Sequence, residues 1–377
     1  MNNTQPYPIN PDRSIPWNAL PELPIADELY KTVEVYEALA RAKEALGRLY
    51  GRSIAIPNPT VLLNSIALKE AKDSSAIENI FTTDDELYQA FSNSEETNIS
   101  NSTKEVLHYR EALWHGLTYL NTKNRFDRDY FISIYQELLQ NNDGIRPEYA
   151  KVYIRRGGSG PTGGKPFYTP PRGKGVVQQK LDNLIQFLND DRIPPADPVL
   201  KMAMAHFQFE AIHPFRDGNG RAGRILNIHY LMTRNLLDFP ILYMSSYILE
   251  HKNEYYERLA GVSQRADWNG LLIFMLTAVE ETSTLTFQKI NEILEAKSTI
   301  LEAIRSETEI RRPDQLVEKL FSQPYTKVAN LTKAGIYAEN TARKYLTELT
   351  DMGILEKRTL QGHHYYLNLE LYHILKT

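Results

Sequence analysis

The stretch HFQFEAIHPFRDGNGRAGRIL, residues 206–226, decides how this chain is interpreted. An apolar helical pattern runs into His213, and a second helical pattern starts just after Asp217. The GNG turn at 218–220 therefore precedes a helix N-terminus, where unpaired backbone N–H groups and the positive end of the helix dipole favour an anion. Glycines remove the Cβ atoms that would hold a phosphoryl group away from the backbone. The sequence predicts a phosphate-binding turn.

The charged residues around the turn suit a nucleotide. Arg221 and Arg224 are three apart, so they share one helical face and can both reach the anion. Asp217 would be repelled by bare phosphate, but it can hold a divalent cation that bridges phosphates. His213 is placed to accept a proton from an attacking hydroxyl, and its ordinary pKa of about 6.5 suits that task. We expect Phe215 to point into the core and anchor the loop. A plain turn with solvated arginines is the alternative, and so many functional residue types at fixed offsets argue against it.

These residues resemble the signature HxFx(D/E)GNGRxxR of the Fic (filamentation induced by cAMP) family. The signature is matched without a departure by His213, Phe215, Asp217, Gly218, Asn219, Gly220, Arg221 and Arg224. The resemblance implies that His213 is the general base and that Asp217 binds Mg²⁺ through the phosphates of ATP. It implies that Asn219 and the glycine amides form an anion hole, and that Arg221 and Arg224 hold the phosphates.

The activity implied by the resemblance is that of a protein adenylyltransferase. Such an enzyme transfers AMP from ATP to a serine, threonine or tyrosine hydroxyl of a target protein and releases pyrophosphate. The intact GNGR weighs against the phosphate-transferring branch of the family. Removal of AMP from modified proteins, with Glu78 and the same loop positioning water, is an alternative within catalysis.

The segment KDSSAIENI, residues 72–80, places Ser74, Glu78 and Asn79 in the order (S/T)xxxE(G/N). Alone, this pattern is more typical of a serine that caps a helix. Beside the Fic signature, it resembles the inhibitory motif of family members whose brake lies N-terminal to the core. The resemblance implies that Glu78 pairs with Arg224 and so competes with the γ-phosphate for one guanidinium. ATP would then bind with its α-phosphate in an unproductive orientation.

A hairpin is predicted where two β-favouring runs, 152–158 and 165–171, flank SGPTGG. It resembles the flap that covers the site in Fic proteins and aligns the target by strand addition. From Arg146 to Lys174 there are seven basic residues and one acid, a net charge of +6, which suits an acidic target or the triphosphate. A solvated polar hairpin is the alternative interpretation.

The segment 245–262 resembles the family stretch that closes over adenine and ribose. We place Tyr255 near the base, with Tyr168 and Thr169 approaching from the flap. Aromatic residues at helical spacing are more often core residues, so that alternative stays open.

Helical patterns dominate the rest of the chain. They cover about 26–49, 58–72, 84–92, 103–121, 128–140, 174–189, 197–212, 268–306, 314–322, 326–334 and 338–353. Two strands follow around a turn at 361–362, and three helices before a β-hairpin are typical of a winged helix. We predict a mainly α fold with three parts: an N-terminal region with the inhibitory helix (1–100), a Fic catalytic core with its flap (101–309) and a winged-helix-like domain (310–377).

Composition narrows the classes of function. The 377 residues are 42% apolar and 24% charged, with no cysteine and a net charge of -4. The absence of cysteine excludes thiolate chemistry, and the negative net charge disfavours a protein that coats nucleic acid nonspecifically. Because no signal peptide or membrane span is apparent, we expect a cytoplasmic protein. The predicted recognition helix, 338–353, is net acidic, so DNA binding is weakly supported. A DNA-binding regulator with a nucleotide-sensing core is nevertheless the rival from another class. Dimerisation is compatible with the helical surfaces and with the resemblance.

Overall fold

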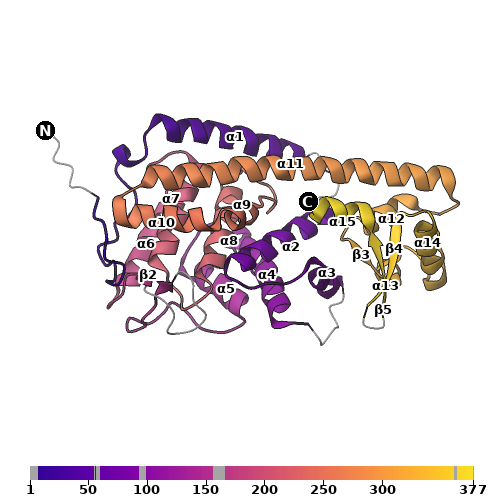
Figure 1. The fold of residues 1–377 in the computed structure, drawn as a ribbon, viewed down its shortest axis with the longest axis horizontal. Helices are drawn as coiled ribbons and strands as arrows, with labels where there is room; N and C mark the ends of the chain where they lie inside the picture. Colours follow the sequence, from indigo (N-terminus) through magenta and orange to yellow (C-terminus); the bar gives the residue numbers. More distant parts are fainter. Residues whose placement is uncertain are drawn as a thin grey trace.

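The computed structural model describes residues 7–54, 56, 60–92, 99–155, 166–360 and 363–376. Its main axis is one long helix, α11 (Trp268–Glu307), which runs from a helical body into a C-terminal unit (Figure 1). At 1.5 Å per residue, its 40 residues span about 60 Å. The mainly α class predicted from the sequence is confirmed.

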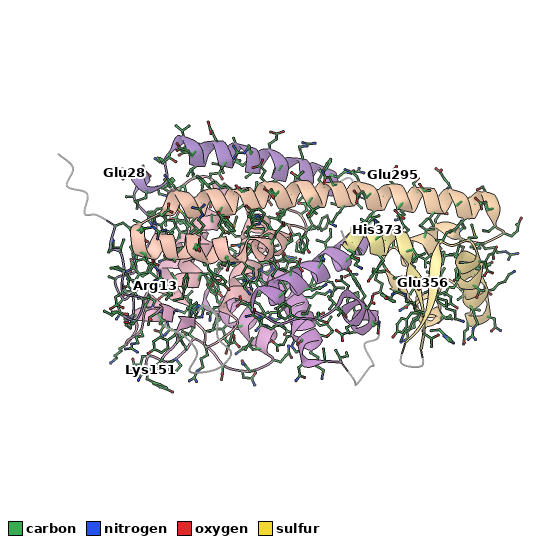
Figure 2. All side chains as sticks on the ribbon, in the orientation of Figure 1. Arg13, Glu28, Lys151, Glu295, Glu356 and His373 are labelled. Atoms are coloured by element: carbon green, nitrogen blue, oxygen red, sulfur yellow. The ribbon has the colours of Figure 1, made fainter. Side chains whose placement is uncertain are left out.

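Helix α1 (Val33–Ile54) lies along α11 and forms the outer layer of the body (Figure 1). Its buried residues recur at the spacing of one helical face: Val35, Ala38, Leu39, Ala42, Leu46 and Leu49. Exposed acids such as Glu28 and Glu295 point outward at this edge of the molecule (Figure 2). The pair therefore buries its apolar faces against each other and against the helices beneath.

The remaining helices of the body pack below this layer. They are α2 (Thr60–Ile77), α3 (Asp84–Ser92), α4 (Asn101–Lys123), α5 (Arg128–Leu139), α6 (Val176–Asn189), α7 (Pro198–Ile212), α8 (Asn219–Thr233), α9 (Met244–Glu250) and α10 (Lys252–Arg265), with a short 3-10 turn, η1 (Asp27–Leu29), before α1. Helix α2 continues five residues beyond the predicted end at 72. Ser74 is thus inside its last turn, and the alternative that Ser74 caps the start of a helix is wrong.

Helices α7 and α8 form the centre of the body. Every residue of α7 from Val199 to Ile212 is buried, because neighbouring helices cover it on all sides. Most of α8 is buried as well. The turn between these helices is therefore held by two elements that have little freedom to move.

The flap begins and ends with an antiparallel pair of short strands, β1 (Ile154–Arg155) and β2 (Pro166–Tyr168), with Ile154 opposite Tyr168. The predicted SGPTGG tip lies outside the described residues. The pairing agrees with the hairpin expected from the sequence.

The C-terminal unit combines short helices with a small sheet. Its elements are α12 (Pro313–Leu320), β3 (Tyr325–Thr326), α13 (Val328–Lys333), α14 (Glu339–Asp351), β4 (Leu355–Leu360), β5 (His363–Asn368) and α15 (Leu369–Lys376). The sheet is antiparallel in the order β3-β5-β4, with Lys357 opposite Tyr366. The three helices and the hairpin occur in the predicted order, and β3 and α15 are additions that the sequence did not indicate.

This unit is fastened to the body at α3 and α11. The Asp85 carboxylate of α3 accepts hydrogen bonds from the hydroxyls of Tyr325 (2.7 Å) and Tyr372 (3.1 Å). Lys289 of α11 donates to the carbonyl of Ile374 at 2.8 Å. The C-terminal unit therefore contacts α3, the helix that follows α2.

By length and composition, α11 is apolar enough to cross a membrane, although the sequence analysis expected no such span. Its apolar residues, however, pack against α1, α7, α9 and α10, and 56% of the apolar window is buried. This is the pattern of a core helix.

Candidate active site

The turn between α7 and α8 begins and ends in left-handed backbone conformations. His213 ends α7 with φ 50°, and its N–H bonds to the carbonyl of Phe209 at 2.9 Å. Gly218 precedes α8 with φ 69°, a value that residues with a Cβ rarely adopt. The first glycine of the GNG turn is thus required by the backbone itself.

Asn219 fixes the shape of the turn. Its Oδ1 accepts from the N–H of Phe215 (2.9 Å), and its Nδ2 donates to the carbonyl of Phe215 (3.0 Å). The Phe215 ring is fully buried and stacks on Tyr135 with centroids 4.3 Å apart, which confirms that it anchors the loop in the core. Both side-chain groups of Asn219 therefore hydrogen-bond within the loop, which fixes its conformation.

Arg146 holds the turn from the other side. Its guanidinium donates to the carbonyls of His213 (2.8 Å), Ile212 (3.2 Å) and Pro171 (2.5 Å), and its own N–H bonds to Pro214. A cation at the C-terminus of α7 satisfies carbonyls that have no intrahelical partner. Arg146 was predicted only as one of the basic residues near the flap, whereas its side chain is buried beneath the turn.

His213 is a neutral base in this setting. Burial, with a contribution from the nearby Arg146 charge, lowers the pKa of His213 to about 4, well below the ordinary value on which the sequence argument relied. Its Nδ1 is 3.3 Å from the carbonyl of Glu210, which can only accept, so we assign the proton to Nδ1. Nε2 then carries the lone pair that can take a proton.

Glu78 lies across the N-terminus of α8. Its Oε1 is 2.8 Å from Arg224 Nη2, and a Cβ added to Gly220 would come within 2.2 Å of the same oxygen. The second glycine of the turn is thus needed for this close approach. A carboxylate therefore occupies the place where the sequence predicts a phosphate.

Arg224 is tied to the end of α2 by further contacts. Its Nε donates to Ser74 Oγ (2.7 Å) and its Nη2 to the Ser74 carbonyl (2.9 Å). The Arg224 side chain is 1% exposed, whereas the Glu78 side chain is 33% exposed. Burial raises the pKa of Glu78, but the Arg224 charge and hydrogen bond outweigh it, so the pKa is lowered overall.

Asn79 lies near the end of the segment 72–80, for which the sequence predicts an inhibitory role. It has φ 63°, the left-handed conformation in which glycine and asparagine are favoured after a helix. Its Oδ1 accepts from Lys252 of α10 at 3.0 Å. The Asn79 position thus turns the chain so that Glu78 faces α8.

The first arginine of the signature, Arg221, has a different partner. Arg221 Nη1 is 3.1 Å from Glu105 Oε2 of α4, and the Arg221 side chain is 3% exposed. Asp217 is exposed at the mouth of the turn, and its Oδ1 accepts from the N–H of Gly218 at 2.6 Å. These two residues lie beside the pocket rather than in its lining.

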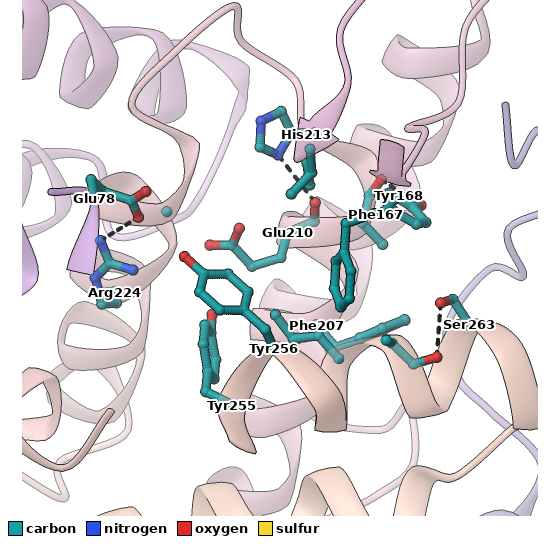
Figure 3. A pocket seen from close by; sticks show the side chains of 15 residues that line it. Glu78, Phe167, Tyr168, Phe207, Glu210, His213, Arg224, Tyr255, Tyr256 and Ser263 are labelled. Carbon is teal, nitrogen blue, oxygen red and sulfur yellow. Dashed lines mark hydrogen bonds and ion pairs between the residues drawn. The ribbon is translucent and has the colours of Figure 1, made fainter. Parts of the chain in front are cut away.

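The pocket in front of the turn brings together Glu78, Tyr168, His213, Gly220, Arg224 and Tyr255 from the predicted set (Figure 3). The empty space within it is about 640 Å³, which includes space open to solvent. Its lining combines charged groups such as Arg224 with apolar side chains such as Phe207 and Leu259.

Of the three residues predicted to approach the adenine and ribose, Tyr168 and Tyr255 line the pocket and Thr169 does not. Tyr168 lines the pocket and donates to the carbonyl of Ala211 at 2.9 Å. Thr169 does not line it, because its hydroxyl bonds to the carbonyl of Arg13 at 2.6 Å and holds the N-terminal lead-in. Tyr255 is buried with its hydroxyl 2.8 Å from His206 Nε2, so its ring forms part of the wall while its hydroxyl is held by α7.

Other residues of the lining were not predicted from the sequence, among them Glu210 and Tyr256. Figure 3 shows the Tyr256 hydroxyl directed toward the Arg224 end and the Glu210 carboxyl beside it. A glutamate within the apolar run 198–212 was a visible signal for the first.

Three family models match consecutive parts of the chain. They are Fic/DOC family N-terminal (residues 36–118), Fic/DOC family (125–231) and protein adenylyltransferase SoFic-like, C-terminal domain (298–371). The chain is a Fic/DOC family protein. The family inferred from the signature is therefore confirmed. The turn belongs to the part that the central model covers, whereas the pocket lining also includes Glu78 and residues of α10 outside that part.

Related proteins share a shorter stretch. Protein adenylyltransferase fic-1 of Caenorhabditis elegans is 30% identical over 134 residues, which are 35% of this chain and 23% of that protein. The probable protein adenylyltransferase aq_aa38 of Aquifex aeolicus is 36% identical over 85 residues, 22% of this chain and 25% of that protein. The chain thus matches about a quarter of the length of these relatives.

Solved structures share the fold over a longer span. A Fic family protein from Desulfovibrio desulfuricans G20 superposes with a TM-score of 0.56 at 18% identity, covering 92% of this chain and 98% of that one. Fic-1 from C. elegans (residues 134–508) superposes with a TM-score of 0.52 at 20% identity, covering 69% and 74%.

Proposed function

We propose that this Fic/DOC family protein is a protein adenylyltransferase whose pocket is held closed to productive ATP by Glu78. The observation that carries the proposal is the pairing of Glu78 with Arg224 at the N-terminus of α8, beside a neutral His213. One carboxylate sits where the backbone amides, the helix dipole and a buried guanidinium favour a phosphate. The relatives named as adenylyltransferases support the same activity.

In the transfer step, a hydroxyl oxygen of the target attacks the α-phosphorus of ATP. The new P–O bond forms as the bond to pyrophosphate breaks, and the hydroxyl proton passes to His213 Nε2. The amides at the start of α8 and Arg224, once released by Glu78, would stabilise the charge on the phosphates. Each of these groups lies on or beside the rigid α7–α8 pair.

The residues present fit a magnesium ion held through the phosphates. Mg²⁺ commonly takes one or two carboxylates together with phosphate oxygens, and Asp217 offers one exposed carboxylate at the mouth of the turn. The described part of the chain contains no group of three His, Asp or Glu side chains suited to a metal ion. Bound there, the ion would neutralise phosphate charge and orient the pyrophosphate that leaves.

The flap supports a protein as acceptor. Its strands β1 and β2 stand at the pocket, and Ile154, Phe167 and Tyr168 line it. A strand edge next to a reacting hydroxyl can align an extended peptide by main-chain hydrogen bonds. We therefore propose an exposed segment of another protein, or of a second copy, as the substrate.

The test uses ATP labelled at the α-phosphorus, incubated with a cell lysate and the purified chain. We expect weak incorporation by the wild type, at least tenfold more by Glu78→Gly, because a charge-assisted contact is worth about 1.5–3 kcal/mol, and none by Glu78→Gly with His213→Ala. Label from the γ-phosphorus should not appear in protein.

The alternatives give different outcomes in the same experiment. Removal of AMP from premodified protein by the wild type, with no incorporation by Glu78→Gly, would favour the reverse reaction. Salt-dependent retention of the chain on DNA without any transfer would favour the regulator with a nucleotide-sensing core.

A further inference from the structure

The N-terminal lead-in contains a segment, residues 10–18, that crosses from α10 to the flap, and we call this segment the strap. At α10, the N–H of Asn10 bonds to the carbonyl of Ser263 at 2.7 Å. Arg13 Nη2 donates to Gln264 Oε1 of the same helix at 3.0 Å. Ser263 lines the pocket, so the strap is fastened directly to one of the pocket walls.

At its other end, the strap is bonded to the flap where β2 ends (Figure 1). The N–H of Trp17 bonds to the carbonyl of Thr169 at 3.1 Å, and the Thr169 hydroxyl donates to the carbonyl of Arg13 at 2.6 Å. The Trp17 ring is 2% exposed and meets the Tyr168 ring edge to face, with centroids 6.3 Å apart. Tyr168 lines the pocket, so the strap contacts the flap wall as well.

One side chain of the strap joins both walls. Arg13 bonds to Gln264 of α10, and its guanidinium carbon lies 5.1 Å from the centroid of the Phe167 ring of β2. Phe167 lines the pocket, whereas Arg13 is exposed and is not part of the lining. The guanidinium therefore packs on Phe167 from outside the pocket, as a cation over an aromatic ring.

The flap gains support from these contacts because its own pairing is short. Strand β1 has two residues and β2 has three, and an isolated two-stranded hairpin is only marginally stable in water. The Tyr168 hydroxyl fastens β2 to α7 through the Ala211 carbonyl, and the strap fastens it to α10. A misplacement of about 1 Å can slow a reaction about 100-fold, so an element that aligns a reacting group must be held in place.

We propose that the strap positions the flap for the acceptor, with Arg13 and Thr169 as positioning residues. They hold β2 in a fixed place relative to α10, so that a peptide strand added to the flap presents its hydroxyl to His213. This inference rests on the proposed function, because it requires transfer to an acceptor that the flap aligns. Neither Arg13 nor Thr169 lines the pocket, so both act on the transfer through the flap.

The test measures flap mobility and transfer in the same variants, all made in the full chain carrying Glu78→Gly. Thr169→Val keeps the shape of the side chain and removes its hydrogen bond to the strap. We expect amide hydrogen exchange in peptides covering 166–174 to become about three- to tenfold faster. Labelling of lysate proteins at saturating ATP should slow by a similar factor. Thr169→Ser, which keeps the hydroxyl, should retain most of the rate and the slow exchange.

Arg13→Ala tests the second contact in the same way and should change both measurements in the same direction. Because Arg13 is exposed, this variant keeps the test decisive if Thr169→Val does not fold, which thermal melting checks. Thr282→Val is the matched control: it removes a buried hydroxyl bond of 2.6 Å to the carbonyl of Ala278, within α11, and should leave both measurements unchanged. The KM for ATP should change less than twofold in every variant.

The outcomes distinguish this inference from the function beneath it. Faster exchange without slower transfer overturns the positioning role. Slower transfer in Arg13→Ala with unchanged exchange also overturns it, because Arg13 would then contact the acceptor directly. A larger change in the KM for ATP than in the saturated rate would mean that the strap shapes the nucleotide site instead. These three results leave the adenylyltransferase proposal intact, whereas absence of labelling by Glu78→Gly itself overturns both.

Discussion

At the scale of single residues, the proposed inhibition depends on the contacts of Arg224. It is bonded to Ser74 through both the hydroxyl and the carbonyl and to the Glu78 carboxylate. Ser74→Ala removes the hydroxyl contact and leaves the charge pair. We expect incorporation of AMP to rise by about three- to tenfold, less than in Glu78→Gly.

The control for this prediction is the neighbouring serine. Ser75 is equally buried, and its hydroxyl has no partner among the described residues, so Ser75→Ala should leave incorporation unchanged. Labelled ATP and gel autoradiography measure all three variants. Identical activity in Ser74→Ala and wild type would show that the Ser74 hydroxyl does not contribute to the proposed inhibition.

The pH profile tests the state of His213. Burial and the Arg146 charge lower its pKa to about 4, so the neutral base is present above that value and is lost as the pH falls through it. In the Glu78→Gly background, kcat/KM should stay level from pH 7.5 to about 5.5. A decline centred near pH 6.5, the ordinary histidine value, would show that the imidazole is solvated rather than buried.

The site residues that could be predicted are those whose role depends on local spacing. The GNG turn, its flanking helices and the arginines follow from sequence offsets alone. Glu210 was not found, because α7 is buried on every side and its periodicity does not mark the face that lines the pocket. Tyr255 and Tyr256 are adjacent, and only the packed helix shows which hydroxyl faces the turn.

At the scale of elements, α3 connects α2 to the C-terminal unit. Asp85 accepts from Tyr325 and Tyr372, and it lies 3.7 Å from Arg358. Asp85→Ala should lower the free energy of unfolding by about 1–2 kcal/mol and speed amide hydrogen exchange in β3 and α15.

Hydrogen exchange followed by mass spectrometry measures this effect directly. Glu302→Ala, an exposed acid on α11, is the matched control. Unchanged exchange in β3 and α15 would mean that the unit is held by its packing on α11 alone.

Most helices were predictable because their apolar residues follow one face, as in α1 and α14. The end of α2 was not, because two serines near its C-terminus look like the start of a helix. Strand β3 has two residues, too few for an alternating pattern, and it forms by pairing with β5, which is distant in sequence. Helix α15 follows β5 without a turn signal.

At the scale of the whole molecule, buried titratable groups set the pH of greatest stability. Burial lowers the pKa of His206, His213 and His229 to about 4, so the unfolded state binds more protons below about pH 6.5 and stability falls as the pH drops. Burial raises the pKa of Glu70 to about 7 and that of Glu210 to about 8. Between about pH 4.5 and these values the folded state binds more protons than the unfolded state, so stability falls as the pH rises.

The two trends balance between about pH 6 and 7, where we expect the maximum. Urea unfolding followed by circular dichroism from pH 5 to 8.5 measures it. Glu210→Gln should flatten the alkaline decline. A stability that climbs steadily to pH 8.5 in the wild type would contradict the burial of these carboxyls in the folded state.

The central claim is that the turn at the start of α8 holds a nucleotide's phosphates beside His213 once Glu78 is gone. A crystal structure of Glu78→Gly with a non-hydrolysable ATP analogue tests it most directly. We predict phosphate oxygens on the amides of Gly220 and Arg221, Arg224 turned from Ser74 toward the phosphates, and His213 Nε2 facing the α-phosphorus. A nucleotide bound elsewhere, with this pocket empty, would contradict the account.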